Sequence, residues 1–251
     1  MNGSIHVRRL TTGVARQRRA SRGRLRYVID DWEDDALPVN AYLIDHPRAR
    51  VLFDTGQTSD AAEPGYLPSW HPFVRLARFE LEKADEVGPQ LASVGVPPES
   101  VGVVVLSHLH NDHMGGVHAF PNATVLVDEG EWRHAQGLGG RLRGYIPGRW
   151  PPQVSVTPVA LRGPGIGPFA RSYDVLGDGR LRLVPTPGHT PGHTSLVVLG
   201  ENRTWLLAGD LVHRADELET GFPVVAAWCR EHDVTVLTAH DELAGRGGTQ
   251  C

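Results

Sequence analysis

Apolar residues run along this 251-residue chain in short, continuous segments that are separated by turn-forming residues. Short apolar runs that are rich in β-branched side chains are typical of strands buried on both faces. Turn residues such as the "HPR" after the first run indicate tight connections between neighbouring strands. The pattern therefore predicts strands at residues 37–45, 49–56, 101–106, 123–131, 179–188, 194–200, 203–210 and 234–241.

Helical spacing of apolar residues occurs in fewer places. Residues 73–95 show it, although Gly88 and Pro89 predict a break into two pieces. A short helix is predicted in "GEWRHAQ" and a longer one around residues 215–232. Residues 137–170 are rich in Gly, Pro and Arg without clear periodicity, which predicts an irregular loop excursion. Loops of that length are usually functional lids or disordered.

The order of these elements bears on domain organisation. No repeat, linker or low-complexity segment divides the chain, and two runs of strands are each accompanied by helices. We therefore predict one layered α/β domain over residues 1–251, which includes an Arg-rich N-terminal segment, 1–30, and the excursion at 137–170. Polar residues follow several strands, where loops bring distant positions together.

Composition narrows the class of protein. The net charge of −4 gives no overall attraction to nucleic acid, and the two cysteines, Cys229 and Cys251, form no C-x-x-C motif. A disulfide framework and cysteine-based metal binding are therefore not indicated. The chain shows no apolar run of membrane-spanning length, so we expect a cytoplasmic protein without membrane or nucleic-acid partners.

One local charge cluster lies near the N-terminus. It consists of eight arginines: Arg8, Arg9, Arg16, Arg18, Arg19, Arg22, Arg24 and Arg26. A nucleic-acid-binding or membrane-binding arm is one interpretation. We favour a solvated edge hairpin or a partly ordered terminus, because no aromatic residue is interleaved before Tyr27.

The segment "SHLHNDHMGG" carries the strongest chemical signal, with His108, His110, Asp112 and His113 directly after an apolar strand. His108 and His110 are two residues apart, so they point to the same side of an extended segment. Asp112 and His113 are adjacent and diverge after the turn. One loop can therefore supply two ligands to one metal ion and two to another, with the donor types that Zn²⁺ accepts.

Three further strand ends carry matching residues. "TPGHTPGH" supplies His189 and His193, "LLAGD" ends with Asp210, and "VLTAH" ends with His240. A carboxylate beside an apolar strand is unfavourable unless a positive charge compensates it, and two metal ions would do so. A single histidine is more often capped or solvated, and we interpret the following in that way: His6, His46, His71, His118, His134 and His232.

Taken together, "HLHNDH", "TPGHTPGH", "AGD" and the late "AH" resemble the metallo-β-lactamase-fold hydrolases over roughly residues 37–241. The resemblance implies a four-layered αββα sandwich with the site at one edge between the sheets. It also implies that Asp54, in "LFDTG", supports the metal loop and that His193 lies outside the ligand set.

The resemblance implies a dinuclear centre, which we predict to hold two zinc ions, with other divalent transition metals as alternatives. The implied ligands are His108, His110 and His189 for one ion, Asp112, His113 and His240 for the other, and Asp210 as a bridge. Two cations roughly 3.5–4 Å apart can share a water molecule and lower its pKa toward about 7. The resulting hydroxide attacks a carbonyl or phosphoryl centre, and Asp112 is the candidate to transfer the proton when the tetrahedral intermediate collapses.

Within the superfamily, "FARSYDVLGDGRLRLVPTPGHTPGHTSLVV" most resembles the N-acyl homoserine lactonase branch. The implied reaction is the opening of a lactone ring, which gives a quorum-quenching activity. Trp70 and Phe73 are candidates to contact an acyl chain, or they simply pack their own loop.

One position departs from the lactonase pattern. Lactonases of this branch commonly carry a tyrosine three residues after the bridging aspartate, where this chain has His213. An imidazole can also donate a hydrogen bond to a substrate carbonyl, but "GD-x-x-H" is similar to aryl-ester and organophosphate hydrolases of the same fold. These activities remain an alternative. A more distant alternative is a non-catalytic or nucleic-acid-processing member of the superfamily. A homodimer is a separate expectation.

Overall fold

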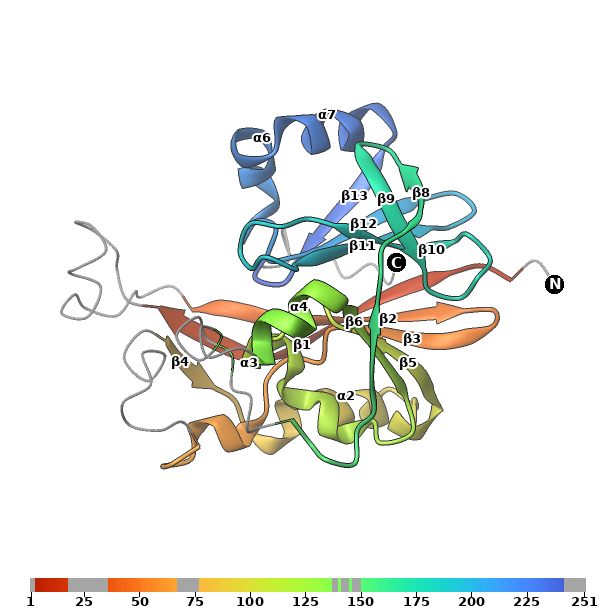
Figure 1. Cartoon of the computed structure of the whole chain (residues 1–251). Helices are drawn as coiled ribbons and strands as arrows, with labels where there is room; N and C mark the ends of the chain where they lie inside the picture. Colours follow the sequence, from red (N-terminus) through yellow and green to blue (C-terminus); the bar gives the residue numbers. More distant parts are fainter. Residues whose placement is uncertain are drawn as a thin grey trace, which may run out of the picture.

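Two mixed β-sheets pack face to face, with helices on their outer faces (Figure 1). The computed structural model describes residues 3–17, 36–66, 77–136, 140, 145 and 150–241. In spatial order, the seven-stranded sheet consists of β4 (Ala77–Glu80), β1 (His6–Gln17), β2 (Leu37–His46), β3 (Ala49–Phe53), β5 (Val101–Val105), β6 (Thr124–Asp128) and β7 (Val156–Val159). The six-stranded sheet consists of β13 (Val234–Thr238), β12 (Thr204–Gly209), β11 (Thr194–Leu199), β10 (Leu181–Pro185), β9 (Phe169–Asp174) and β8 (Gly163–Ile166).

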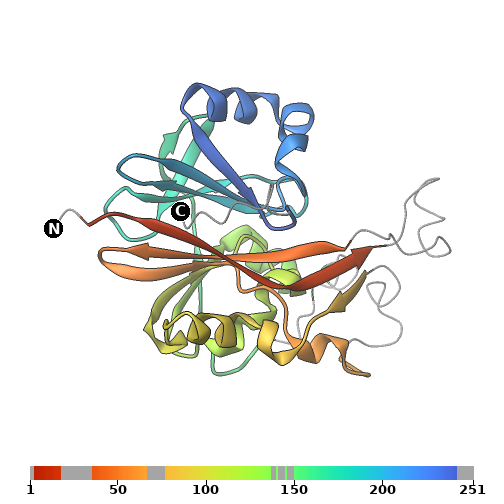
Figure 2. The same cartoon turned by 180° about the vertical axis from the view of Figure 1, so that it is seen from behind.

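The helices are short and lie mainly on the two outer faces, as Figure 2 shows from behind. The α-helices are α2 (Val87–Ser93), α3 (Asn111–Met114), α4 (Glu129–Gln136), α6 (Leu218–Gly221) and α7 (Pro223–Glu231). The 3₁₀ helices are η1 (Ser59–Ala62), η2 (Lys83–Asp85), η3 (Pro98–Ser100), η4 (Gly115–Ala119) and η6 (Ala215–Glu217). No helix within the described ranges is long and apolar enough to cross a membrane.

Alternation along the strands explains the layers. In β11, Leu196 and Val198 pack between the two sheets, whereas Val197 packs on the opposite face with α7. In β3, Phe53 faces the space between the sheets and Leu52 faces α2. Both faces of these strands are therefore buried, which is why their sequences are continuously apolar. Three apolar clusters separate four layers, so the predicted αββα sandwich is confirmed.

Several strand ends from both sheets meet at one edge. The backbone N–H of Thr194, at the start of β11, donates to the carbonyl of Ser107 after β5 at 2.9 Å. The N–H of Asn40 in β2 donates to Ala239, directly after β13, at 2.8 Å. The residues that follow β3, β5, β10, β12 and β13 are therefore held close together although they are distant in sequence.

The structure corrects the helix that was predicted at residues 73–95. Residues 77–80 form strand β4, and residues 71–76 lie outside the described part of the chain. Gly88 and Pro89 do not break a helix, because α2 begins at Val87 and holds both in its first turn. A proline is tolerated there, since the first N–H groups of a helix have no intrahelical partner.

The excursion predicted at 137–170 was also wrong in part. Residues 156–159 and 163–166 form β7 and β8, and β9 begins at Phe169. Strand β7 extends the parallel part of the larger sheet beside β6. Short strands with Gly and Pro give little periodic signal, which explains the error.

The N-terminal prediction of an edge hairpin or loose terminus was wrong for its first part. Strand β1 carries Arg8, Arg9 and Arg16 and is an inner strand, paired with β2 on one side and β4 on the other. Its apolar residues Val7 and Leu10 are buried on opposite faces. The remaining arginines of the cluster, from Arg18 to Arg26, lie outside the described residues.

Candidate metal centre

The loop after β5 carries four of the predicted ligands. Helix α3 begins at Asn111, with His110 as its N-cap, so the chain reverses within one turn. This reversal returns His113 to the side of His108, and their ring centroids lie 4.0 Å apart. His108, His110 and His113 are buried, and Asp112 is partly exposed. The loop therefore presents its donors to one small space, as the sequence predicted.

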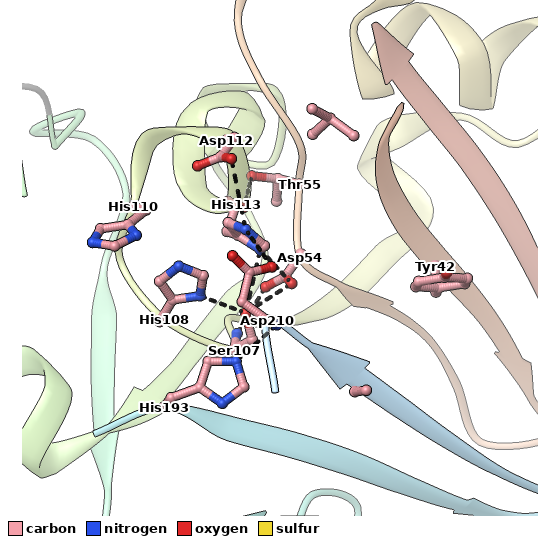
Figure 3. A network of polar contacts seen from close by, with 12 residues as sticks. Tyr42, Asp54, Thr55, Ser107, His108, His110, Asp112, His113, His193 and Asp210 are labelled. Atoms are coloured by element: carbon pink, nitrogen blue, oxygen red, sulfur yellow. Dashed lines mark hydrogen bonds and ion pairs between the residues drawn. The ribbon is translucent and has the colours of Figure 1, made fainter. Parts of the chain in front are cut away.

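Asp54, directly after β3, holds this loop in place (Figure 3). Its Oδ1 accepts a hydrogen bond from the N–H of Ser107 at 2.7 Å, and its Oδ2 accepts one from the Ser107 hydroxyl at 2.8 Å. The same Oδ2 lies 2.9 Å from Nδ1 of His113. Asp54 has a φ of 58°, a backbone conformation that is uncommon for a residue other than glycine and that occurs at functional sites. The expected supporting position of Asp54 agrees with these contacts.

Hydrogen bonds at Nδ1 orient two further imidazole rings. His113 directs Nδ1 to Asp54, and His240 directs Nδ1 to the carbonyl of Pro38 at 2.9 Å. Each ring consequently turns its Nε2 toward Asp210 Oδ1, at 3.3 Å in both cases. Metal-binding histidines commonly use one nitrogen for such a protein contact and keep the other for the metal.

His108, His110 and His189 form the other group of imidazoles. The Nδ1 of His110 lies 2.9 Å from Nε2 of His189, which in turn lies 3.3 Å from Asp210 Oδ2. The Nδ1 of His108 contacts the Ser107 hydroxyl at 3.0 Å. The two oxygens of Asp210 therefore face opposite groups, as a bridging position requires.

The donor atoms form compact sets. Each of the following groups has one donor atom per residue, all within 4.8 Å of one another: His108, His110 and His189; His108, His113 and Asp210; Asp112, His113 and His240; and His189, Asp210 and His213. The first and third sets match the two predicted ligand triads. All seven predicted ligands are thus brought together in the structure.

Three buried polar atoms in this cluster make no hydrogen bond among the described residues, although two of them, on His113 and Asp210, lie 3.3 Å apart as an ion pair. They are Nε2 of His108, Nε2 of His113 and Oδ1 of Asp210. Buried polar atoms are normally satisfied, and unsatisfied ones call for an explanation such as a bound ion. Imidazole and carboxylate donors in sets of three are those that zinc and similar ions accept. The residues therefore fit a transition-metal site.

The electrostatics of the cluster agree with a cation site. Burial raises the pKa of Asp210, but His113 and His240 more than offset this and hold it well below its usual value. Burial lowers the pKa of His113, yet the carboxylates of Asp210 and Asp54 raise it well above 6.5. Burial, reinforced by neighbouring histidines, lowers the pKa of His108 well below 6.5. The ionised form of Asp210 is thus stabilised by positive charge beside it, whereas the lowered pKa of His108 keeps that imidazole neutral.

His193 has a different environment. Its Nε2 accepts a hydrogen bond from the N–H of Asp210 at 3.0 Å, and its Nδ1 contacts the carbonyl of Thr186 at 3.1 Å. Burial lowers its pKa to about 3, so the ring is neutral. Both ring nitrogens contact the protein, which agrees with a position outside the ligand set.

His213 reaches the same space from the segment after β12. Its ring centroid lies 5.5 Å from that of His240 and 6.4 Å from that of His189. The backbone fixes it, because its N–H donates to Glu217 at 3.0 Å and its carbonyl accepts from Thr238 at 2.8 Å. A partly exposed imidazole beside the donor cluster can contact a substrate.

Two other predicted contacts, Trp70 and Phe73, lie outside the described residues. Tyr145, by contrast, was not anticipated from the sequence. It is buried, forms a backbone bridge with His110 and places its ring centroid 5.3 Å from that of His110. Its segment has no periodicity, so only its aromatic character within a Gly-rich and Arg-rich stretch could have drawn attention to it.

Comparisons with known proteins agree with this geometry. The family model described as the metallo-beta-lactamase superfamily matches residues 34–241. The N-acyl homoserine lactonase AttM of Rhizobium radiobacter is 32% identical over 231 residues, which cover 83% of this chain and 83% of the relative. An N-acyl homoserine lactonase of a Bacillus species is 29% identical over 188 residues, which cover 74% of this chain and 69% of the relative.

A solved structure extends the comparison to the fold. It is an N-acyl homoserine lactone hydrolase with N-hexanoyl-L-homoserine, its product, bound at the catalytic metal centre. It matches with a TM-score of 0.74 at 21% identity and covers 96% of this chain and 94% of that chain. At this identity the likeness shows a shared fold.

Proposed function

Because the chain belongs to the metallo-beta-lactamase superfamily, we propose that it is a dinuclear metal-dependent hydrolase that opens N-acyl homoserine lactones. The observation that carries this proposal is the convergence of seven donor residues on a space with three unsatisfied buried donor atoms. The lactone is the proposed substrate class because relatives that carry this name match most of the chain.

The residues divide into two triads with one shared carboxylate. We assign His108, His110 and His189 to one ion, Asp112, His113 and His240 to the other, and Asp210 to both. Two divalent ions held there, proposed to be zinc, would polarise the lactone carbonyl and lower the pKa of a water molecule.

The reaction adds water across the ester bond of the ring. The water oxygen forms a bond to the carbonyl carbon, the ring C–O bond breaks, and the ring oxygen takes up a proton as a hydroxyl group. We propose that Asp112 transfers that proton. Its side chain is partly exposed, and its Oδ2 lies 3.8 Å from His240 Nε2 and 3.9 Å from His113 Nε2, so the carboxylate borders both the ligand cluster and solvent.

His213 is proposed to hold the substrate. Its ring borders both His189 and His240, and its backbone contacts fix its position. An imidazole N–H at this position can donate to the lactone carbonyl and stabilise the negative charge that develops on its oxygen. Acyl-chain contacts by Trp70 and Phe73 remain a prediction.

A second candidate function is hydrolysis of aryl esters or organophosphate triesters. His213 favours it, because an imidazole stands where lactonases of this branch commonly carry the phenol of a tyrosine. The deciding experiment compares an N-acyl homoserine lactone, an aryl ester and a phosphotriester with the same metal-loaded preparation. We expect the largest kcat/KM for the lactone. A larger value for either other substrate would reassign the function. A cytoplasmic location and a homodimer stay predictions from the sequence.

A further inference from the structure

Glu131 is a fully buried acidic residue in the first turn of α4, and the proposed reaction gives it no role. A carboxylate is rarely buried unless its oxygens are satisfied, so its partners show what it does. They come from two loops that both carry predicted metal ligands.

The first partner lies in the loop after β5. The backbone N–H of Leu109 donates to Glu131 Oε1 at 3.0 Å. Leu109 stands between His108 and His110, so this bond fixes the backbone from which both imidazoles project. In an extended segment, a shift of the middle residue moves both neighbours together.

The other partners lie in the loop between β10 and β11. The hydroxyl of Thr190 donates to Glu131 Oε2 at 2.8 Å, and the N–H of Gly192 donates to the same oxygen at 3.2 Å. Thr190 directly follows His189. One carboxylate thus connects the loop of His108 and His110 to the loop of His189.

Helix α4 itself is held firmly. Asp128 Oδ1 accepts from the N–H of Gly130 at 2.8 Å and of Glu131 at 3.1 Å, which caps the start of the helix. Gly192 lies against the backbone of Glu131 so closely that a Cβ there would stand 2.2 Å from Glu131 N. The carboxylate is therefore presented from a tightly packed support with little freedom to move.

We propose that Glu131 is a positioning residue that sets the geometry of the three-histidine site formed by His108, His110 and His189. This inference rests on the proposed function, because it assumes that the cluster binds metal. The other triad has further supports of its own, since Asp54 contacts His113 and the Pro38 carbonyl contacts His240, while Asp54 also holds Ser107 beside His108. Loss of the Glu131 carboxylate should therefore weaken one site and spare the other.

The substitution Glu131→Gln tests this with little change in shape. A glutamine offers one oxygen and one NH₂ group, whereas the site presents N–H donors on both sides. Whichever way the amide is oriented, its NH₂ group faces the N–H of Leu109 or that of Gly192. The matched control is Glu86→Gln, because Glu86 is also buried and accepts hydrogen bonds from Ser59, while its contact on the ligand side is His118, five residues beyond His113.

The readout is zinc competition with a chromophoric chelator, started from metal-free full-length protein, with urea unfolding of the same samples. His110→Ala and His240→Ala identify which dissociation constant belongs to which site. We expect Glu131→Gln to raise the dissociation constant of the three-histidine site by about 10- to 100-fold, the usual scale for a residue that orients a ligand. The other site should be unchanged, and Glu86→Gln should change unfolding only.

Each other outcome is decisive. Equal loss at both sites, or a loss of stability with both zinc affinities intact, would overturn the proposal and leave Glu131 a structural residue. If Glu131→Gln does not fold, Thr190→Val removes one donor from the same carboxylate and should weaken the same site in the same direction. Wild-type protein that binds no zinc would overturn this inference together with the proposed function, whereas zinc binding without lactone hydrolysis would overturn the proposed function alone.

Discussion

The carboxylate of Asp54 lies 2.9 Å from Nδ1 of His113, and both side chains are fully buried. This contact joins the end of β3 to helix α3 and turns Nε2 of His113 toward Asp210. Replacing Asp54 with Ala should weaken binding of the ion assigned to Asp112, His113 and His240 by about 10- to 100-fold. Equilibrium dialysis against a zinc buffer measures this, with Asp45→Ala at the surface pair with Arg50 as the control. Unchanged zinc affinity would remove Asp54 from the support of the site.

Asp210 faces both imidazole groups, so its replacement should affect both ions. Asp210→Ala is expected to lose both metals together and to abolish hydrolysis. His240→Ala should empty mainly the site assigned to Asp112, His113 and His240, because Nε2 of His240 faces only one oxygen of Asp210. Elemental analysis of both variants after purification makes the comparison. Near-normal activity of Asp210→Ala would show that the assignment of the bridge is wrong.

His213 should affect turnover without affecting metal content. His213→Ala is expected to lower lactone kcat by up to about 10³-fold, the scale for loss of one preorganised donor. His213→Tyr should preserve or raise lactone hydrolysis and reduce hydrolysis of aryl esters and phosphotriesters. Steady-state kinetics on both variants, with metal content measured in parallel, test this. Wild-type kinetics in both variants would place His213 outside the mechanism.

A pH effect on stability is expected from His46, far from the donor cluster in sequence. Burial, with help from Arg180 and Arg48, lowers its pKa below 6.5 despite Asp178 at 3.0 Å. The unfolded chain then binds a proton more readily than the folded one, so this contribution to stability is full above about pH 6.5 and declines as the pH falls below it. Urea unfolding should show a smaller loss between pH 7.5 and 5.5 for His46→Gln than for the wild type. Equal losses would contradict the assignment.

The ligands could be predicted from the sequence because each follows a strongly apolar strand, so strand ends alone placed them at one edge. Glu131 could not be predicted in this way. An acidic residue in the first turn of a helix is common, because its negative charge interacts favourably with the helix dipole. The hydrogen-bond partners of Glu131 are 22, 59 and 61 residues away in the sequence. Only the tertiary structure shows that this side chain is buried between two loops.

The strands of the fold also divide into those that the sequence predicted and those that it did not. Strands such as β5 and β11 were predicted because both faces are buried and the sequence is continuously apolar. Strand β8, "GPGI", was missed because it is short and rich in Gly and Pro, and it relies on pairing with β9. Strand β1 was missed because its arginines dominate the local pattern, while its apolar residues Val7 and Leu10 are buried on opposite faces.

The most direct test of the dinuclear hydrolase is a titration of metal-free protein with zinc while the opening of an N-acyl homoserine lactone is followed by proton release. The account predicts that the rate rises with added zinc and reaches its maximum at about two equivalents per chain, as two sites with three ligands each and one shared carboxylate require. A maximum at one equivalent, or no lactone hydrolysis at any zinc concentration, would contradict it.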